Sequence, residues 1–246
     1  GAPYTAATEK YDGTSWTTVN NMLETNAGAG SCGTQTAALA AGGYDGTSYT
    51  TKAQSYDGTS WSEEAAITTA RTLGPGGLGT SIAALEVGGA SPGNVYDLVE
   101  KYDGTSWTEV GDIPTPTSSL AAVGTITAAL AMGGGPGYKT NTTSYDGTSW
   151  TAVNGLTTGR RNNCGFGSQT AALTMAGDTG SYSALTEKWD GTSWTEVGDL
   201  GTARTSSASG GSSSDGLIAG GSAPGTSGIT EEWADPAYAI KTVTVS

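Results

Sequence analysis

The stretch Tyr11-Asp12-Gly13-Thr14-Ser15-Trp16 decides the fold, because the chain repeats it along its whole length. Three more complete copies begin at Tyr56, Tyr102 and Tyr145. A fifth copy starts with Trp189 in place of Tyr, and a sixth keeps only the aromatic, Trp233. We call this phrase the anchor phrase and its first aromatic residue the anchor. Successive anchors are 45, 46, 43, 44 and 44 residues apart. A fixed period of this length is typical of a repeat architecture.

Each copy predicts a β-hairpin. The Thr-x-Val that follows Trp alternates as a strand does. Asp can bind the amides of its own turn, and Gly takes the left-handed position. We therefore interpret the repeated aspartates as turn residues. We do not expect them to bind calcium, because no cluster of oxygen ligands at loop spacing accompanies them. They are Asp12, Asp57, Asp103, Asp146 and Asp190.

The rest of each repeat predicts two further strands. Segments of small residues, such as 27–33 and 206–211, suit an inner edge where several backbones converge. The next segment is the most apolar of the unit, and in four of five units it ends in a Gly pair such as Gly42-Gly43. Four short antiparallel strands per repeat are typical of a blade of a β-propeller.

The Gly pair after an apolar strand, the Tyr-Asp turn and the Trp beyond it resemble the Kelch repeat, the blade type also found in galactose oxidase. The near identity of the copies, with Tyr-Asp-Gly-Thr-Ser-Trp-Thr-x-Val and Gln-Thr-Ala-Ala-Leu, further resembles repeats of marine phage tail-fibre-like proteins and bacterial surface proteins. This resemblance covers nearly the whole chain. It implies a propeller and an extracellular or virion-surface location, but propellers host many unrelated functions.

The number of blades follows from a count. Six anchor hairpins stand against five small-residue strands and five apolar strands, which favours a single all-β propeller of five four-stranded antiparallel blades over residues 1–246. The surplus hairpin is either Thr5 to Val19 or Ile229 to Ser246. It could add to the last blade as a terminal strand clasp or meet another chain. Six blades stay open if an inner strand pair comes from elsewhere. Ala239 to Val245 alternates well enough to be a closing strand.

The start of the chain falls within a repeat. Gly1 to Tyr4 align with Gly135 to Tyr138, so we expect a trimmed chain or a piece of a longer protein.

Composition excludes several function classes. Ten basic against 23 acidic residues give a net charge of −13, which disfavours nucleic acid and anionic membranes as partners. No stretch approaches the roughly 20 apolar residues of a membrane span. Histidine is absent, which removes the commonest metal ligand and the usual general base. We therefore expect no enzyme, no metal and no cofactor. We expect Cys32 and Cys164 to be free, buried thiols.

Tyrosines recur in the loops after the Gly pairs, which are the most variable part of the repeat. Tyr4, Tyr49, Tyr138 and Tyr182 precede their anchor by seven residues and Tyr96 by six, whereas the last unit has Thr226 there. Either each ring packs against the next blade, or the phenols form an exposed ring that stacks on sugars. Variable loops on a constant frame are typical of a binding surface.

Arginines recur as well. Arg71, Arg160 and Arg204 occupy equivalent places in three connectors, the polar segments that lead from one hairpin to the next small-residue segment. Each could bind backbone carbonyls or an acidic neighbour. Alternatively, they face the channel mouth and hold a carboxylate or sulfate of a glycan.

These features predict a non-enzymatic binding or adhesion module, such as a receptor-binding propeller of a phage tail fibre or a cell surface. Its expected partner is a host-surface glycan or protein receptor, with other chains of a fibre or a homo-oligomer as further partners. Two alternatives remain: a purely structural spacer or decoration, and an engineered consensus propeller.

Overall fold

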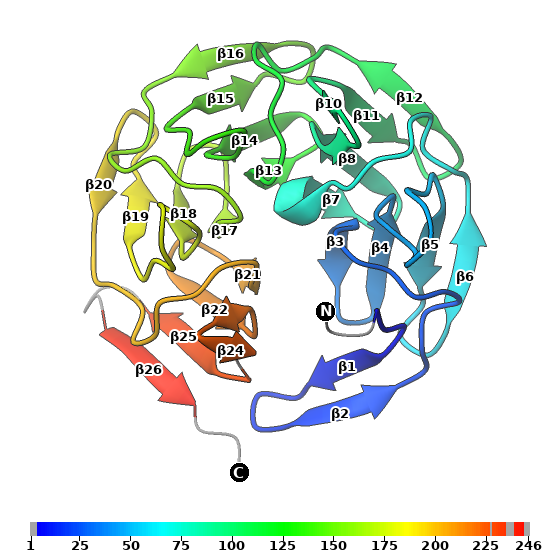
Figure 1. Ribbon diagram of the computed structural model, residues 1–246, viewed down its shortest axis with the longest axis horizontal. Helices are drawn as coiled ribbons and strands as arrows, with labels where there is room; N and C mark the ends of the chain where they lie inside the picture. Colours follow the sequence, from blue (N-terminus) through cyan, green and yellow to red (C-terminus); the bar gives the residue numbers. More distant parts are fainter. Residues whose placement is uncertain (1–3, 227, 235–238, 244–246) are drawn as a thin grey trace.

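The computed structural model describes residues 4–226, 228–234 and 239–243, and its strands form a ring around a central channel (Figure 1). Five four-stranded antiparallel sheets radiate from the channel, so the predicted five-bladed all-β propeller is confirmed. Blade 1 contains β3 (Gly30–Thr34), β4 (Ala37–Ala41), β5 (Ala53–Tyr56) and β6 (Trp61–Glu64). Blade 2 contains β7 (Gly77–Thr80), β8 (Ala83–Val87), β11 (Val99–Tyr102) and β12 (Trp107–Val110). Blade 3 contains β13 (Ala121–Thr125), β14 (Ala128–Met132), β15 (Thr142–Tyr145) and β16 (Trp150–Val153). Blade 4 contains β17 (Cys164–Gly167), β18 (Ala172–Met175), β19 (Thr186–Trp189) and β20 (Trp194–Glu196). Blade 5 contains β21 (Ala208–Gly211), β22 (Asp215–Ala219), β25 (Thr230–Ala234) and β26 (Ala239–Val243).

The remaining elements are short. The hairpins β9 (Ala90–Ser91) with β10 (Asn94–Val95), and β23 (Ser222–Ala223) with β24 (Gly225–Thr226), lie in loops that follow Gly pairs. One 3-10 turn, η1 (Gly74–Gly76), precedes β7. Within the described ranges, no helix has the length and apolar character needed to cross a membrane.

The small-residue segments form the inner strands that surround the channel, as predicted (Figure 1). Glycine is required where the inner strand turns into the second strand. At Gly33 the backbone has φ of 111°, and an added Cβ would lie 2.3 Å from the carbonyl oxygen of Ala37. A side chain at this point would be strained and would clash with the backbone of the turn.

The anchor aromatics fill the space between neighbouring blades, which confirms their predicted role. Tyr145 and Trp150 of blade 3 pack in one cluster with Leu85 of blade 2. Trp189 and Trp194 of blade 4 pack likewise with Leu130 of blade 3. Buried clusters of this kind join blades 1 to 5 in sequence and supply the apolar area that a glycine-rich chain otherwise lacks.

The surplus hairpin is the N-terminal one, β1 (Thr8–Tyr11) with β2 (Trp16–Val19), which we call the half-blade. It lies in the ring between blade 5 and blade 1 (Figure 1). Trp61 Nε1 donates to Thr8 Oγ1 at 3.0 Å, as Trp194 Nε1 of blade 4 donates to Thr142 Oγ1 of blade 3. On its other side, Trp16 Nε1 donates to Thr230 Oγ1 of blade 5 at 3.4 Å. The half-blade is thus the outer half of a blade at a sixth position.

Strand β26 completes blade 5. The predicted closing strand is β26, which pairs with β25; residues 244–246 lie outside the described residues. The half-blade forms a two-stranded sheet of its own and does not extend the sheet of blade 5. Among the described strands, therefore, no sheet combines the two ends of the chain. The sequence alignment of Gly1 to Pro3 also concerns residues that the structure does not describe.

Candidate functional site

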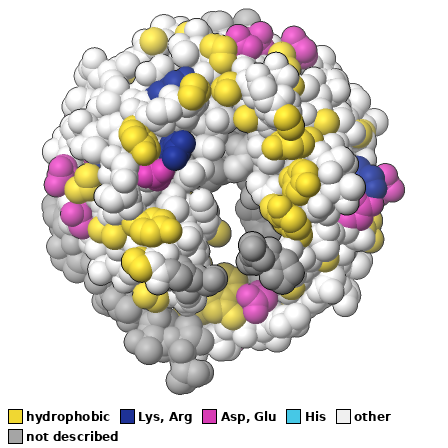
Figure 2. Space-filling model, viewed as in Figure 1, with side chains coloured by type: hydrophobic (Ala, Val, Ile, Leu, Met, Phe, Trp, Pro, Cys, Tyr) yellow, Lys and Arg dark blue, Asp and Glu magenta, His cyan; other side chains and the backbone are white. Residues whose placement is uncertain are grey.

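The variable loops and the connectors that precede the inner strands meet on one face of the ring, which we call the loop face. Single bridges between backbones join the two in successive units: Thr72 with Ala90, Ser118 with Gly135, Arg161 with Asp178, and Thr205 with Ser222. Because consecutive strands run in opposite directions, the Asp-Gly-Thr-Ser turns lie on the opposite face. Figure 2 shows the loop face, with the channel opening at its centre and hydrophobic side chains around it.

Five residues with left-handed backbone surround the mouth of the channel, one from each complete blade. They are Gly28, Gly74, Ser119, Asn162 and Ser206, with φ between 51° and 67°. Three of them carry side chains, which this conformation disfavours by about 1 kcal/mol or more each. Their backbones also join neighbours: Asn162 N donates to Ser119 O at 2.8 Å, and Ser206 N donates to Asn162 O at 3.0 Å.

Sequence reasoning missed this ring of left-handed residues. A signal was present, because each of the five precedes its inner strand and each is Gly, Ser or Asn. These residue types are common in turns, however, so the signal is weak.

The mouth of the channel holds a cavity of about 550 Å³. Among the residues that the structure describes, its lining includes Ser31, Ser119, Asn162 and Ser209, together with several glycines, and no charged residue. This volume is typical of small-molecule sites. Hydroxyl and amide groups can both donate and accept hydrogen bonds, so the cavity suits a neutral polar ligand.

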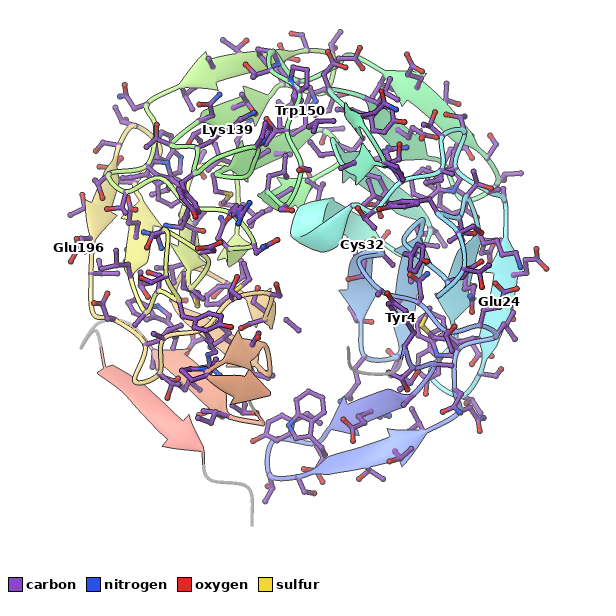
Figure 3. All side chains as sticks on the ribbon, viewed as in Figure 1. Tyr4, Glu24, Cys32, Lys139, Trp150 and Glu196 are labelled. Carbon is purple, nitrogen blue, oxygen red and sulfur yellow. The ribbon has the colours of Figure 1, made fainter. Side chains whose placement is uncertain are left out.

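The tyrosines stand on the loop face, where three of them contact a neighbouring side chain and also remain partly exposed. Tyr4, Tyr138 and Tyr182 remain 49%, 46% and 42% exposed. Tyr4, labelled in Figure 3, packs edge-on against Tyr44 of the next unit with ring centroids 5.3 Å apart. The hydroxyl of Tyr182 lies 3.5 Å from Ser222 Oγ of the next blade. Each ring therefore touches its neighbour and still offers surface to solvent.

The other two tyrosines are half-buried. Tyr49 packs edge-on against Tyr44, with centroids 5.3 Å apart. The hydroxyl of Tyr96 shares a hydrogen bond of 2.8 Å with Ser91 Oγ within its own loop. These two rings offer less surface to a ligand than the first three.

Tyr44 is an aromatic of this face that sequence reasoning missed. It begins Tyr44-Asp45-Gly46-Thr47-Ser48-Tyr49, an additional copy of the anchor phrase within a loop. The copy forms the same turn, with Thr47 N and Ser48 N both donating to Asp45 Oδ1 at 2.7 Å. The signal was plain in the sequence, but the copy falls outside the regular period.

One partly exposed arginine was also missed. Arg161 lies against the ring of Tyr138, with 5.3 Å between its guanidinium carbon and the ring centroid. It also donates to Asp178 Oδ2 from Nε and Nη2, at 3.0 and 2.9 Å. The ion pair places the guanidinium beside the tyrosine ring, and the carboxylate of Asp178 offsets its positive charge toward an anionic ligand.

The three arginines considered for ligand binding are buried instead. Each is 0% exposed and bonds a glutamate two residues before the next anchor. The pairs are Arg71 with Glu100 (2.5 Å), Arg160 with Glu187 (2.7 Å) and Arg204 with Glu231 (2.5 Å). A side chain without exposed surface cannot contact a ligand, so the candidate site excludes these arginines. Their observed role is the other one considered, the tie to an acidic neighbour.

The complete blades without the arginine replace both partners. Blade 1 has Asn26 and Gln54 at the two positions, and blade 3 has Thr117 and Thr143. Gln54 Oε1 still accepts a backbone N–H, that of Leu23, at 2.9 Å. The pair is thus a structural link whose two members change together.

The repeated aspartates are turn residues, as predicted. Asp146 Oδ1 accepts the backbone N–H groups of Thr148 and Ser149 at 2.9 and 2.8 Å, and the other copies do the same. These N–H groups, that of the serine first, lower the pKa of each aspartate. Over the described part of the chain, no group of three or more acidic or cysteine side chains could hold a metal ion.

Neither cysteine forms a disulfide, as predicted. Cys164 is buried, and its burial raises the pKa of the thiol to about 12. Cys32 is half-buried, which differs from the prediction, and its pKa is raised as well, by burial and by Glu86.

Comparison with solved structures finds YjhT, which superposes with a TM-score of 0.75 over 98% of this chain and 97% of that one. The chain has a Kelch-like propeller fold. The two sequences are 14% identical, so the likeness concerns the fold alone. No protein-family model matches the sequence, and no curated protein matches it.

Proposed function

We propose that this propeller is a non-enzymatic binding module whose loop face recognises a glycan, as part of a phage tail fibre or a surface protein. The observation that supports it best is the neutral, hydroxyl-lined cavity at the channel mouth, with half-exposed tyrosines around it. Such modules act outside the cell or on the virion surface, where host glycans or receptors are accessible.

The chemistry of the face fits a sugar. The C–H faces of a pyranose can cover a phenol ring, while its hydroxyls bond to serine, asparagine and backbone groups. A neutral glycan is favoured over an anionic one, because the chain carries a net charge of −13 and Arg161 is already paired with Asp178. The buried arginines add no charge to this surface.

A glycan array followed by host-cell binding tests the proposal. We expect Tyr138→Ala and Tyr182→Ala to weaken binding at least tenfold each, because each removes an exposed ring. Asn162→Gly removes an amide from the cavity, and glycine adopts the left-handed backbone at this position without strain. This variant should also weaken binding.

Ile82→Ser is the matched control. Ile82 is 70% exposed and lies in the turn between β7 and β8, on the face opposite the loops, so binding should not change. Full binding by folded Tyr138→Ala and Tyr182→Ala proteins would remove these tyrosines from the site. No binding to any glycan or host surface would contradict the adhesin itself.

A purely structural role is the second candidate, and the half-blade is the observation that favours it. A sheet with only two strands leaves an edge on which an assembly can build. Light scattering separates the two candidates: a monomer that binds sugars supports the first, and a stable trimer or filament that binds none supports the second.

A further inference from the structure

We propose that the inner half of the sixth position is a docking site for a β-hairpin of the repeat's own inner-strand type. This hairpin adds to the free edge of β1 and brings an arginine to Glu9. The inference concerns the side of the ring rather than the loop face and does not depend on the proposed function.

The half-blade is seated as a complete blade is. Gln35 Nε2 donates to Tyr11 O, as Gln169 Nε2 of blade 4 donates to Tyr145 O of blade 3. Asn20 Nδ2 donates to Thr59 O at 2.7 Å, and its counterpart Asn154 donates to Thr192 O at 2.9 Å. Together with the hydrogen bonds of Trp16 and Trp61 on the two sides, these contacts place β1 and β2 where the third and fourth strands of a complete blade lie.

The edge of β1 that faces the channel has no described partner. In a complete blade the third strand pairs on both sides, as β15 does with β14 and β16. Among the described strands, β1 pairs only with β2. A row of unpaired N–H and C=O groups is a template for a further strand.

Apolar side chains around this position are less covered than their counterparts. Leu217 of blade 5 stands where Leu130 stands in blade 3, yet Leu217 is half-buried and Leu130 is 0% exposed. Trp16 is 36% exposed, against 7% for Trp150. An inner strand pair is the element that covers these residues elsewhere in the ring.

Glu9 gives the site its chemical selectivity. It stands two residues before its anchor, the place of Glu100, Glu187 and Glu231, which are buried and each bonded to an arginine. Glu9 is exposed. In the complete blades the arginine comes from the connector just before the inner strand pair, so an occupant with that connector brings the matching charge.

The chain itself provides a probe and a natural control. Residues 200–221 carry Thr202-Ala203-Arg204, an inner strand pair and a Gly pair. Residues 113–134 carry the same elements of blade 3, with Thr117 in place of the arginine. Peptides of both segments can be titrated into the full chain while thermal unfolding and acrylamide quenching of tryptophan are measured.

We expect the 200–221 peptide to bind one to one, to raise Tm and to protect Trp16 from quenching, an effect absent in Trp16→Phe. Arg204→Met in the peptide should weaken binding at least tenfold to the unchanged chain and have little effect on the Glu9→Gln chain. The 113–134 peptide should bind more weakly, and its affinity should be the same for the unchanged chain and the Glu9→Gln chain. Tyr138→Ala should leave peptide binding unchanged, which separates this site from the loop face.

A fusion covers the case in which the free peptide does not form strands. Placing residues 200–221 directly before Gly1 should raise Tm and shield Trp16, and Arg204→Met in the fused copy should reverse part of both effects. Unchanged Tm and quenching in the fusion, together with no peptide binding, would overturn the proposal. An affinity that neither Glu9→Gln nor Arg204→Met changes would also overturn it. So would a dimer of the chain alone that blocks peptide binding, because the occupant would then be a second copy of the chain.

Discussion

Blade 3 and the half-blade share the same six-residue phrase, Tyr145 to Trp150 in one and Tyr11 to Trp16 in the other. Both form a hairpin in the same register, with Tyr opposite Trp. Their ring centroids lie 4.9 and 5.1 Å apart. Burial differs, because Trp150 is 7% exposed and Trp16 is 36% exposed.

The difference separates local from tertiary causes. The Asp-Gly turn and the aromatic pair are determined by the phrase itself, since they form without inner strands. Burial of the rings depends on the inner strand pair of the same blade and of its neighbour. The stability that each aromatic contributes should therefore follow its place in the ring rather than its sequence.

Substitution of the two tryptophans tests this directly. Trp150→Ala should lower the free energy of unfolding by about 3–5 kcal/mol, because it removes a buried ring from the core between blades 2 and 3. Trp16→Ala should cost about 1–2 kcal/mol, because part of its surface already faces water. Urea unfolding measures both, and equal losses would contradict the comparison.

The glutamates make a second matched pair. Glu187→Gln should cost about 3 kcal/mol or more, because it leaves the guanidinium of Arg160 buried without its charge partner. Glu9→Gln should change stability by less than about 0.5 kcal/mol, as for other exposed sites.

Blade 1 supplies the control for this pair. The double variant Arg160→Asn with Glu187→Gln copies Asn26 and Gln54, and it should recover much of the loss of Glu187→Gln. If the single variant Glu187→Gln unfolds no more easily than Glu9→Gln, the ion pair has no structural role.

Glu86 extends the comparison to a carboxylate that is buried without hydrogen bonds to the described residues. It lies on β8 and is 0% exposed, and neither carboxylate oxygen has a hydrogen-bond partner within the described ranges. Burial raises its pKa from 4.5 to about 8, although Arg71 lowers it. The folded state therefore binds a proton that the unfolded state releases above pH 4.5, so stability should fall as pH rises from 4.5 to 8.

Thermal unfolding across this range measures the effect. The fall should reach about 1.4 kcal/mol per pH unit at its steepest and level off above pH 8. Glu86→Gln should remove this slope, whereas Glu9→Gln should not alter it. The turn aspartates, whose pKa values are lowered, lose their contribution only as pH falls below about 4 and so do not interfere. A flat profile in the unchanged protein would contradict ionisation of Glu86 in this range.

Much of the fold could be predicted from the sequence, because the fold is local and repeated. The phrase at Tyr11 predicted the hairpins, and the five apolar strands, together with the five small-residue strands, predicted five complete blades. The partners of the arginines were also readable: Arg71, Arg160 and Arg204 occur in the units with a glutamate two residues before the anchor. Their burial was not readable, since it depends on how neighbouring blades close around them. The left-handed backbone at Ser119 and Asn162 was hidden for a similar reason, because these residues also adopt ordinary conformations.

The smallest effect concerns the hydrogen bond between neighbouring blades. The Nε1 of Trp194 has Thr142 as its acceptor. Those of Trp107 and Trp150 are buried and have no acceptor among the described residues, because Ala53 and Val99 stand at the matching positions. Thr142→Val should cost about 1 kcal/mol, and Val99→Thr, nearly equal in size, should gain up to about 1 kcal/mol by giving Trp150 an acceptor. At the half-blade, Thr230→Val should cost less than Thr142→Val, because its bond to Trp16 is longer, at 3.4 Å, and only partly buried. Urea midpoints of the three variants rank these effects. A loss of stability in Val99→Thr would show that the cost of burying the hydroxyl exceeds the gain from the new bond, and that the unpaired indoles are tolerated because apolar packing of Trp150 matters more.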